Sequence, residues 1–149
     1  KKVRNVRPNI SITSDFIIGY PGESNECFEE TLDLIEQIGF DDGYSFIYSK
    51  RPGTPASSEP DNISISEKKK RLSLVQDLIR TNSEKYLSKL VGTSQEVLIE
   101  GKSKTDPMKL FGRTFTNKIV NFRGSADLIG QIIDVKIIGS NRNSLDGAL

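Results

Sequence analysis

The chain has 149 residues, of which 35% are hydrophobic and 28% are charged, and its formal net charge is +1. This balance is typical of one or two small folded domains and excludes a disordered chain, and no apolar run reaches the roughly 20 residues that a membrane-spanning helix needs. Because the sequence has no histidine and one cysteine, His-based acid–base catalysis and a zinc or iron–sulfur site built by this chain alone are excluded, and a reducing, cytoplasmic setting is expected.

The first third of the chain predicts two strands. Residues 10–20, ISITSDFIIGY, are rich in β-branched side chains and nearly continuously apolar up to Gly19, a pattern typical of a strand covered on both faces. Residues 44–49, YSFIYS, alternate between aromatic or aliphatic and small polar side chains, as a second strand would.

The chain begins with KKVRNVRPNI and has no starting methionine, so we also expect it to be a piece of a longer protein.

A helix is predicted between the two strands, over residues 23–40. Its apolar side chains recur at helical spacing, Ser24 or Asn25 can cap its start, and Gly39 is placed to cap its end. A strand, a helix and a strand within about 35 residues predict a βαβ unit, and therefore a parallel sheet.

A turn-forming segment and a long basic helix are predicted next. Residues 50–60, KRPGTPASSEP, hold three prolines, and Ser64 and Glu67 after them stand at the spacing of a capping box. Gly92 is placed to end the helix. The basic side chains of this helix either meet a polyanion or form a solvated face, and the sequence leaves both interpretations open.

From residue 93 onward the pattern changes to short alternating strands separated by Gly, Pro and Asn, which predicts a small closed antiparallel β-barrel. The expected fold class is therefore an α/β part followed by an all-β barrel, with domains over residues 1–90 and 91–149. The charge follows this division, because residues 1–62 carry a net charge of −5 and the remainder carries an excess of basic side chains. This asymmetry weakly favours contact between the second half and a polyanion.

The turn GYPGE, residues 19–23, is the first candidate site. It follows the carboxyl end of the first predicted strand, the edge at which parallel sheets bind ligands. Gly19 and Gly22 allow a close approach to the backbone, Pro21 stiffens the turn, and Glu23 offers a carboxylate to an amine or a ribose hydroxyl. The alternative is an ordinary turn in which Glu23 merely begins a helix.

The segment YSKRPGTPA, residues 48–56, is the second candidate site. It follows the second predicted strand and should lie on the same edge of the sheet, where Arg51 can pair with a carboxylate or a phosphate. The alternative is a proline-stiffened loop with a solvated Lys-Arg pair.

These motifs together resemble those of the radical SAM methylthiotransferases. SDFIIGYPGES followed by FIYSKRPGTPA resembles the last strands of that family's radical SAM barrel, a partial TIM-type barrel. LIEGKSKTDPMKLFGRTFTNKIVNFRG and LIGQIIDVKIIGSNRNSLDG resemble its C-terminal TRAM domain, and VNF and NSLDG most resemble the MiaB-type branch, which acts on isopentenylated adenosine in tRNA. The resemblance covers the chain from about Pro8 to Gly147.

The resemblance implies an enzyme that uses S-adenosylmethionine and two 4Fe–4S clusters to add a methylthio group to the isopentenylated adenosine on the 3′ side of the tRNA anticodon. The cluster cysteines of the family would lie upstream of Lys1, so this chain should hold no metal, contain no catalytic residue and be inactive by itself, at most binding tRNA. The implied partner is the anticodon stem-loop of tRNA, with no membrane and no second copy, and the sulfur donor stays open.

The resemblance also assigns residues. The cofactor-binding positions that it implies are Asp15, Ile17, Gly19, Pro21, Gly22 and Glu23. The positions that it implies for the lining of the active site are Tyr48, Arg51, Pro52, Gly53 and Thr54.

The predicted barrel carries the residue types that bind RNA: basic side chains for phosphates, aromatic rings for bases and amides for base edges. The RNA-binding candidates are Lys102, Lys104, Arg113, Phe115, Asn117, Lys118, Asn121 and Asn143. For the aromatic residues, including Phe111 and Phe122, the alternative is a place in the core of the barrel.

Two other functions stay open. The first alternative is a non-catalytic RNA-binding module in which the barrel binds the RNA. The second alternative is part of a methylthiotransferase that acts on a ribosomal protein or on threonylcarbamoyl-adenosine in tRNA.

Overall fold

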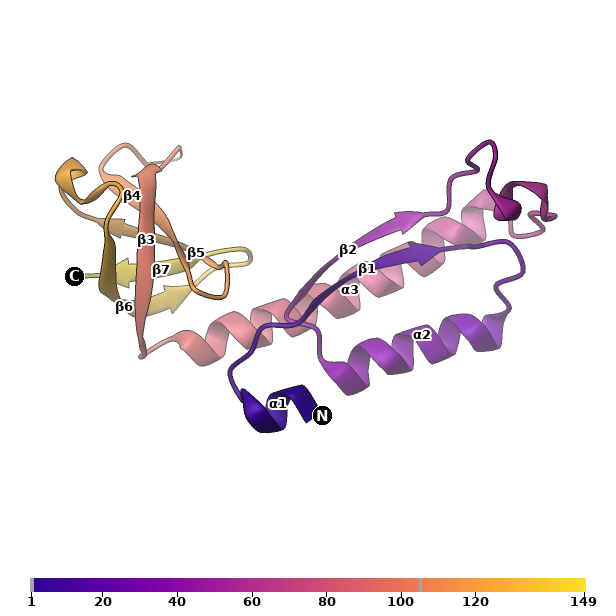
Figure 1. Cartoon of the computed structure of the whole chain (residues 1–149), viewed down its shortest axis with the longest axis horizontal. Helices are drawn as coiled ribbons and strands as arrows, with labels where there is room; N and C mark the ends of the chain where they lie inside the picture. Colours follow the sequence, from indigo (N-terminus) through magenta and orange to yellow (C-terminus); the bar gives the residue numbers. More distant parts are fainter. Residues whose placement is uncertain (1, 105) are drawn as a thin grey trace. The chain divides into compact units, whose positions relative to one another are not determined.

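The structure is a computed structural model that describes residues 2–104 and 106–149 (Figure 1). Its residues divide into two compact units, Lys1–Asn82 and Ser83–Leu149. Among the described residues, no helix is long and apolar enough to cross a bilayer.

The first unit is an α/β unit built on two parallel strands. Its elements in chain order are α1 (Lys2–Val6), β1 (Thr13–Ile18), α2 (Asn25–Ile38), β2 (Asp42–Ile47), the 3-10 helix η1 (Pro55–Ser58) and the larger part of α3 (Ile65–Leu90). Strands β1 and β2 pair in parallel, from Thr13 opposite Asp42 to Ile18 opposite Ile47, and α2 connects them (Figure 1). The predicted βαβ unit is confirmed.

Helix α2 begins and ends at the predicted caps. The Ser24 hydroxyl accepts a hydrogen bond from the Cys27 N–H at 3.2 Å, and Gly39, with φ of 60°, donates its N–H to the Ile35 carbonyl at 2.9 Å. The start of α3 is capped in the same way, since the Ser64 hydroxyl accepts from the Glu67 N–H at 3.1 Å. These caps satisfy backbone groups that a helix end leaves without partners.

Helix α1 was not expected from the sequence. Its Arg4 donates hydrogen bonds to the carbonyls of Ile38 and Gly39, at the end of α2, the latter at 2.8 Å. Arg4 also lies 3.5 Å from the Asp41 carboxylate, which in turn accepts the Ile12 N–H at 2.8 Å. A cationic side chain at this place satisfies the last carbonyls of α2 and favours its dipole.

The core of the first unit lies on one face of the two strands. It consists of Phe16, Ile18, Phe28, Ile35, Phe40, Val75 and Ile79. On the opposite face Ile17 is 59% exposed and its neighbour Phe46 on β2 is 56% exposed. The expectation that β1 is covered on both faces is therefore wrong for the described residues, because the helices that pack on this pair of strands, α2 and α3, contribute to a core on one face only.

The second unit is a closed five-stranded barrel. Its elements are the end of α3, β3 (Ser94–Lys102), β4 (Lys109–Thr114), β5 (Ile119–Arg123), η2 (Ala126–Leu128), β6 (Ile132–Ser140) and β7 (Leu145–Ala148). The strands close in the order β3-β4-β5-β7-β6, which confirms the predicted small barrel. One pair, β5 with β7, is parallel. A closed ring with an odd number of strands cannot alternate in direction throughout, so one parallel pair is unavoidable.

The last turns of α3 belong to the barrel unit. Leu87 is 2% exposed and lies in the barrel core, while Tyr86 and Leu90 pack against that core. Contacts thus divide the chain after Asn82, whereas the sequence suggested a domain boundary after Leu90. The residue at which an independently folding barrel domain begins stays a prediction.

Candidate functional site

The two candidate loops lie side by side in the first unit. They follow β1 and β2, which run in parallel, so their starts share the carboxyl edge of the sheet. The Tyr48 N–H donates to the Ile18 carbonyl at 2.8 Å, and the ring of Tyr48 meets that of Tyr20 edge-on at 5.3 Å. The structure therefore brings together the turn at residues 19–23 and the start of the loop at residues 48–56.

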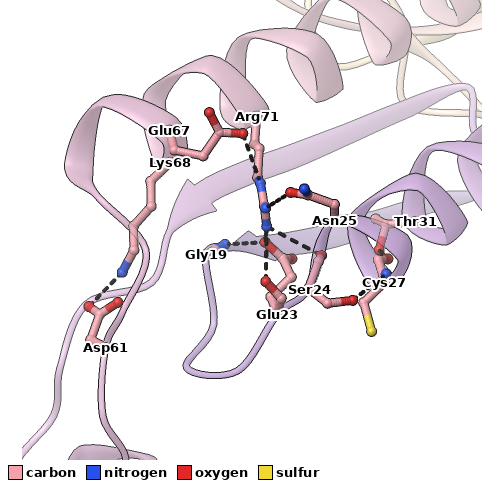
Figure 2. Close-up of polar contacts among 10 residues, drawn as sticks. All are labelled: Gly19, Glu23, Ser24, Asn25, Cys27, Thr31, Asp61, Glu67, Lys68 and Arg71. Atoms are coloured by element: carbon pink, nitrogen blue, oxygen red, sulfur yellow. Dashed lines mark hydrogen bonds and ion pairs between the residues drawn. The ribbon is translucent and has the colours of Figure 1, made fainter.

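The carboxylate of Glu23 closes the first turn upon itself. Its Oε2 atom accepts a hydrogen bond from the Gly19 N–H at 2.9 Å and lies 2.8 Å from Nη1 of Arg71 (Figure 2). The sequence suggested that this carboxylate meets a ligand. In the structure its Oε2 atom has partners within the protein, and these partners fix the shape of the turn.

Arg71, on α3, is the centre of this arrangement (Figure 2). Its guanidinium is buried, and Nη1 also donates to the Glu23 carbonyl at 3.1 Å. Its Nη2 donates to Oδ1 of Asn25 at 2.6 Å, and its Nε donates to Oε1 of Glu67 at 3.3 Å. The guanidinium also lies 5.1 Å from the ring centroid of Phe28. One side chain thus binds both the turn and the first residues of α2.

Burial and ion pairing shift the pKa of Arg71 in opposite directions. Burial lowers the pKa of its guanidinium, but hydrogen bonds and opposite charges from Glu23 and Glu67 outweigh this, so that its pKa lies above the ordinary value. Arg71 is therefore charged at neutral pH, and its buried charge is paired.

Lys68, one turn before Arg71, holds the other side of the turn. It is 3% exposed, its Nζ lies 2.6 Å from Oδ2 of Asp61 and 5.8 Å from the ring centroid of Tyr48. The hydrogen bond from Lys68 lowers the pKa of the Asp61 carboxyl. A Cβ atom added at Gly19, where φ is +72°, would lie 2.6 Å from Cγ of Lys68. The space beside Gly19 is therefore filled by the stem of Lys68.

Other parts of the candidate site remain open. A Cβ atom added at Gly22 or Gly53 would meet nothing within 4 Å. Asp15 and Ile17 project from the exposed face of β1, whereas Pro21 is buried. The Tyr48 hydroxyl is buried and has no hydrogen-bond partner among the described residues. This unsatisfied group is unusual in a folded protein and lies beside the turn.

The remaining residues predicted to line the active site are exposed in the loop after β2. They are Arg51, Pro52, Gly53 and Thr54. The Thr54 hydroxyl donates to the Arg51 carbonyl at 2.8 Å, which gives this loop a local turn. The guanidinium of Arg51 is thus placed on a structured loop and faces solvent.

The described residues contain no group of three or more potential metal ligands. The lone cysteine, Cys27, is exposed on α2. An iron–sulfur cluster therefore does not fit the described part of the chain.

The residues predicted to bind RNA fall into different environments of the barrel. Lys102, Lys104, Asn117 and Asn143 are exposed, and Phe115 is 89% exposed. Arg113 and Asn121 are half-buried. The eighth candidate, Lys118, is buried.

Two buried side chains bear on these predictions: Lys118, an RNA-binding candidate, and Phe122, an aromatic residue with a core alternative. Lys118 is 7% exposed, and its Nζ lies 5.4 Å from the ring centroid of Tyr86. Phe122 is 1% exposed and lies in the barrel core, as the alternative interpretation of the aromatic residues predicted. Phe111 is half-buried.

Hydrogen bonds close the hairpin between β4 and β5, whose backbone carries Phe115. Oγ1 of Thr114 accepts from the Lys118 N–H at 3.0 Å, and the Asn117 N–H donates to the Thr114 carbonyl at 2.8 Å. Arg113 donates to Oδ1 of Asn117 at 2.9 Å, and Asn117 itself has a positive φ of 63°. An exposed aromatic ring on a hydrogen-bonded turn is accessible to a base that stacks on it.

Comparison with known proteins finds relatives of both units. Residues 88–149 match the family model of the TRAM domain. The chain is 52% identical over 147 residues to tRNA-2-methylthio-N(6)-dimethylallyladenosine synthases of Mannheimia succiniciproducens and Haemophilus influenzae, and 53% identical to that of Actinobacillus pleuropneumoniae. Each match covers 99% of the chain and 31% of the relative. The expected resemblance to MiaB-type methylthiotransferases is confirmed, and the chain spans 31% of the length of these curated relatives.

Three residues of the site were not singled out from the sequence: Asp61, Lys68 and Arg71. The spacing of Glu67 and Arg71 signals only a pair on one helix face. The link from Arg71 to Glu23 crosses 48 residues, and no local pattern indicates it.

Proposed function

We propose that this chain is part of a tRNA methylthiotransferase, which adds a methylthio group to isopentenylated adenosine beside the anticodon. The observation that carries the proposal is the 52% identity over 147 residues, because it includes the GYPGE turn and the following loop as well as the barrel. The activity is proposed for the complete protein, of which this chain supplies two parts. The proposed location is the cytoplasm, where the exposed thiol of Cys27 stays reduced.

The first part is a portion of the S-adenosylmethionine site. The open backbone at Gly22 and the exposed side chains of Asp15 and Ile17 fit a nucleoside-like ligand at the carboxyl edge of the sheet. When bound, S-adenosylmethionine supplies the radical that activates the adenine C–H bond. In this proposal the backbone of Gly22 contacts the cofactor. Gly19 and Glu23 fix the shape of the turn, and the side chain of Pro21 is buried.

The loop after β2 would face the substrate side of the same site. Tyr48, Arg51, Pro52, Gly53 and Thr54 follow the strand whose end lies beside the turn. An exposed arginine on a structured loop can bind a phosphate of the substrate with two parallel hydrogen bonds.

The two 4Fe–4S clusters are proposed for the complete protein and do not fit this chain. Cys27 is its one cysteine, and the described residues bring no set of ligands together. The cluster ligands would have to come from another part of the protein.

The second part is a surface for tRNA. The exposed side chains of Lys102 and Lys104 are proposed to meet phosphates, and the exposed ring of Phe115 is proposed to meet a base. Arg113 is half-buried and pairs with Glu100 at 3.2 Å, so it is less available to a phosphate. Unpaired loop bases are what proteins recognise in RNA by stacking, and the anticodon loop provides them. Lys118 has little exposed area and is the weakest of the RNA-binding candidates.

A non-catalytic RNA-binding module is the second candidate function. It is favoured by one observation, that the exposed Phe115 hairpin needs no residue of the first unit for its hydrogen bonds. Binding of S-adenosylmethionine separates the two candidates, because only the enzyme requires it.

The test uses the complete protein and two binding measurements. Equilibrium dialysis with radiolabelled S-adenosylmethionine and fluorescence anisotropy with a labelled anticodon stem-loop should both show binding, and the isopentenylated stem-loop should bind tighter than the unmodified one. Binding of RNA without S-adenosylmethionine would leave the RNA-binding module as the function. A preference for a threonylcarbamoylated stem-loop, or for a ribosomal protein, would replace the proposed substrate.

A further inference from the structure

The turn that is proposed to meet S-adenosylmethionine has no large apolar anchor of its own at its outer corner. Gly22 has nothing within 4 Å of an added Cβ, and Gly19 and Gly22 both have positive φ values, of +72° and +83°. A chain of this kind has many accessible conformations unless other groups fix it. Within the turn the Glu23 N–H donates to the Tyr20 carbonyl at 2.9 Å, and Pro21 is buried. The side-chain contacts that hold the Glu23 carboxylate come from α3.

Arg71 connects α3 both to the turn and to the start of α2. Arg71 binds Oε2 of Glu23, and the same oxygen accepts the Gly19 N–H, so that one carboxylate joins the two ends of the turn to the helix (Figure 2). Arg71 also donates to Oδ1 of Asn25 at the start of α2. A guanidinium can bind both groups at once because its donors form a rigid planar fork.

The burial of these groups makes the connection strong. The side chains of Arg71 and Glu23 are 5% and 10% exposed. A buried ion pair is costly to break, because removal of one partner leaves a charge without compensation. The same charges in solvent would contribute little.

We propose that Arg71 is a positioning residue of the S-adenosylmethionine site: acting through Glu23, it fixes the Gly19–Glu23 turn in the conformation that receives the cofactor. This inference rests on the proposed function. It gives Glu23 the role of a bridge to Arg71 in place of a direct ligand contact. The sequence left open whether the basic residues of α3 contact a polyanion or form a solvated face. For one of them, Arg71, this inference assigns a place in the interior of the site.

The test measures two quantities on the complete protein. The first is the rate of amide hydrogen exchange in the peptide that contains residues 16–24. The second is the dissociation constant of S-adenosylmethionine by equilibrium dialysis, below the unfolding temperature of every variant. Exchange reports on the turn without requiring turnover or loaded clusters.

The variants are Arg71→Met, Arg71→Lys and Glu23→Gln, with two controls on the same helix. Arg80→Met removes an exposed arginine that pairs with Asp77, and Val75→Ala destabilises the same core without touching the turn. Val75→Ala shows what loss of stability alone does to cofactor affinity.

Arg71→Met should speed exchange in the turn and weaken S-adenosylmethionine binding by roughly tenfold or more, the size associated with loss of a hydrogen bond to a charged group. Arg71→Lys should lie between Arg71→Met and wild type, because one ammonium cannot bind Glu23 and Asn25 together. Both controls should keep wild-type affinity. Glu23→Gln combined with Arg71→Met should lose less than the sum of the single losses, because both changes break one connection.

Two results would overturn the inference alone: unchanged exchange in Arg71→Met, or a loss of affinity no larger than that of Val75→Ala. Should Arg71→Met fail to fold, Arg71→Lys and Glu23→Gln carry the same comparison. A wild-type protein that binds no S-adenosylmethionine would overturn the proposed function and this inference with it.

Discussion

Nη1 of Arg71 lies 2.8 Å from Oε2 of Glu23, although 48 residues of sequence separate the two side chains. This contact joins the long helix α3 to the turn after β1 within the first unit. Since Lys68 on the same helix fills the space beside Gly19, the turn is held from two sides by one element. The conformation of the candidate site therefore depends on the start of α3 as much as on the GYPGE segment itself.

Substitution of the two glycines of the turn should have unequal effects. Both have positive φ, so alanine at either position should cost about 1–2 kcal/mol of backbone strain. Gly19→Ala should cost a further ~1–3 kcal/mol, because its Cβ would lie 2.6 Å from Cγ of buried Lys68, whereas Gly22→Ala meets nothing. Urea unfolding of the two variants measures the difference, and equal stabilities would show that Lys68 does not hold the turn.

The ion pair between Lys68 and Asp61 should make stability depend on acid pH. The hydrogen bond from Lys68 lowers the pKa of Asp61 in the folded protein, so its contribution is present above the unfolded pKa of about 3.9 and is lost as pH falls through the lowered folded value. Asp61→Asn should thus be less stable than wild type at neutral pH, and the difference in stability should close as pH falls below the unfolded pKa of about 3.9. Urea midpoints across this range provide the measurement, and a gap that is constant with pH would contradict it.

The end of α3 should be required by the barrel. Leu87 is 2% exposed in the barrel core, so Leu87→Ala should destabilise the second unit by about 2–5 kcal/mol. For the same reason a fragment of residues 83–149 should be more stable than a fragment that begins at residue 93. Thermal unfolding of both fragments decides between the division of contacts at Asn82 and the predicted boundary at Leu90. Equal unfolding temperatures would favour the latter.

Phe115 should contribute to RNA affinity without contributing to its salt dependence. Phe115→Ala should weaken binding of the anticodon stem-loop by about 1–3 kcal/mol, the value of one base stacked on an aromatic ring. The slope of log affinity against log salt should not change, since no phosphate contact is lost. Anisotropy over a salt series tests this in the complete protein.

Two further variants serve as matched controls for Phe115. Phe115→Tyr keeps the ring and should keep the affinity. Lys102→Ala removes an exposed charge from β3 and should reduce the slope by about 0.7, the contribution of one phosphate contact on a single strand. A change of slope in Phe115→Ala, or no change of affinity, would exclude the stacking role.

The sequence predicted those features that depend on local chemistry. The caps Ser24, Gly39 and Ser64 each follow from residue types that satisfy free backbone groups at helix ends, and the structure confirms all three. The barrel was also predictable, because alternation and frequent turn residues persist over its whole length.

Features that depend on distant partners were not predictable. No local pattern says that Arg71 binds Glu23, or that Arg4 in an unexpected helix binds the end of α2. Lys68 and Arg71 look like surface residues in a basic stripe, since burial of a charge becomes visible only once its partner is placed. The exposed face of β1 was missed because an apolar run does not reveal how many sides are covered.

The most direct test of the central claim is mass spectrometry of tRNA nucleosides from cells that lack the gene for the complete protein. We predict that 2-methylthio-isopentenyladenosine disappears and that isopentenyladenosine accumulates in its place. The complete gene should restore the methylthio nucleoside, and a gene for these 149 residues alone should not. An unchanged level of the methylthio nucleoside in the deletion strain would contradict the assignment to tRNA methylthiolation.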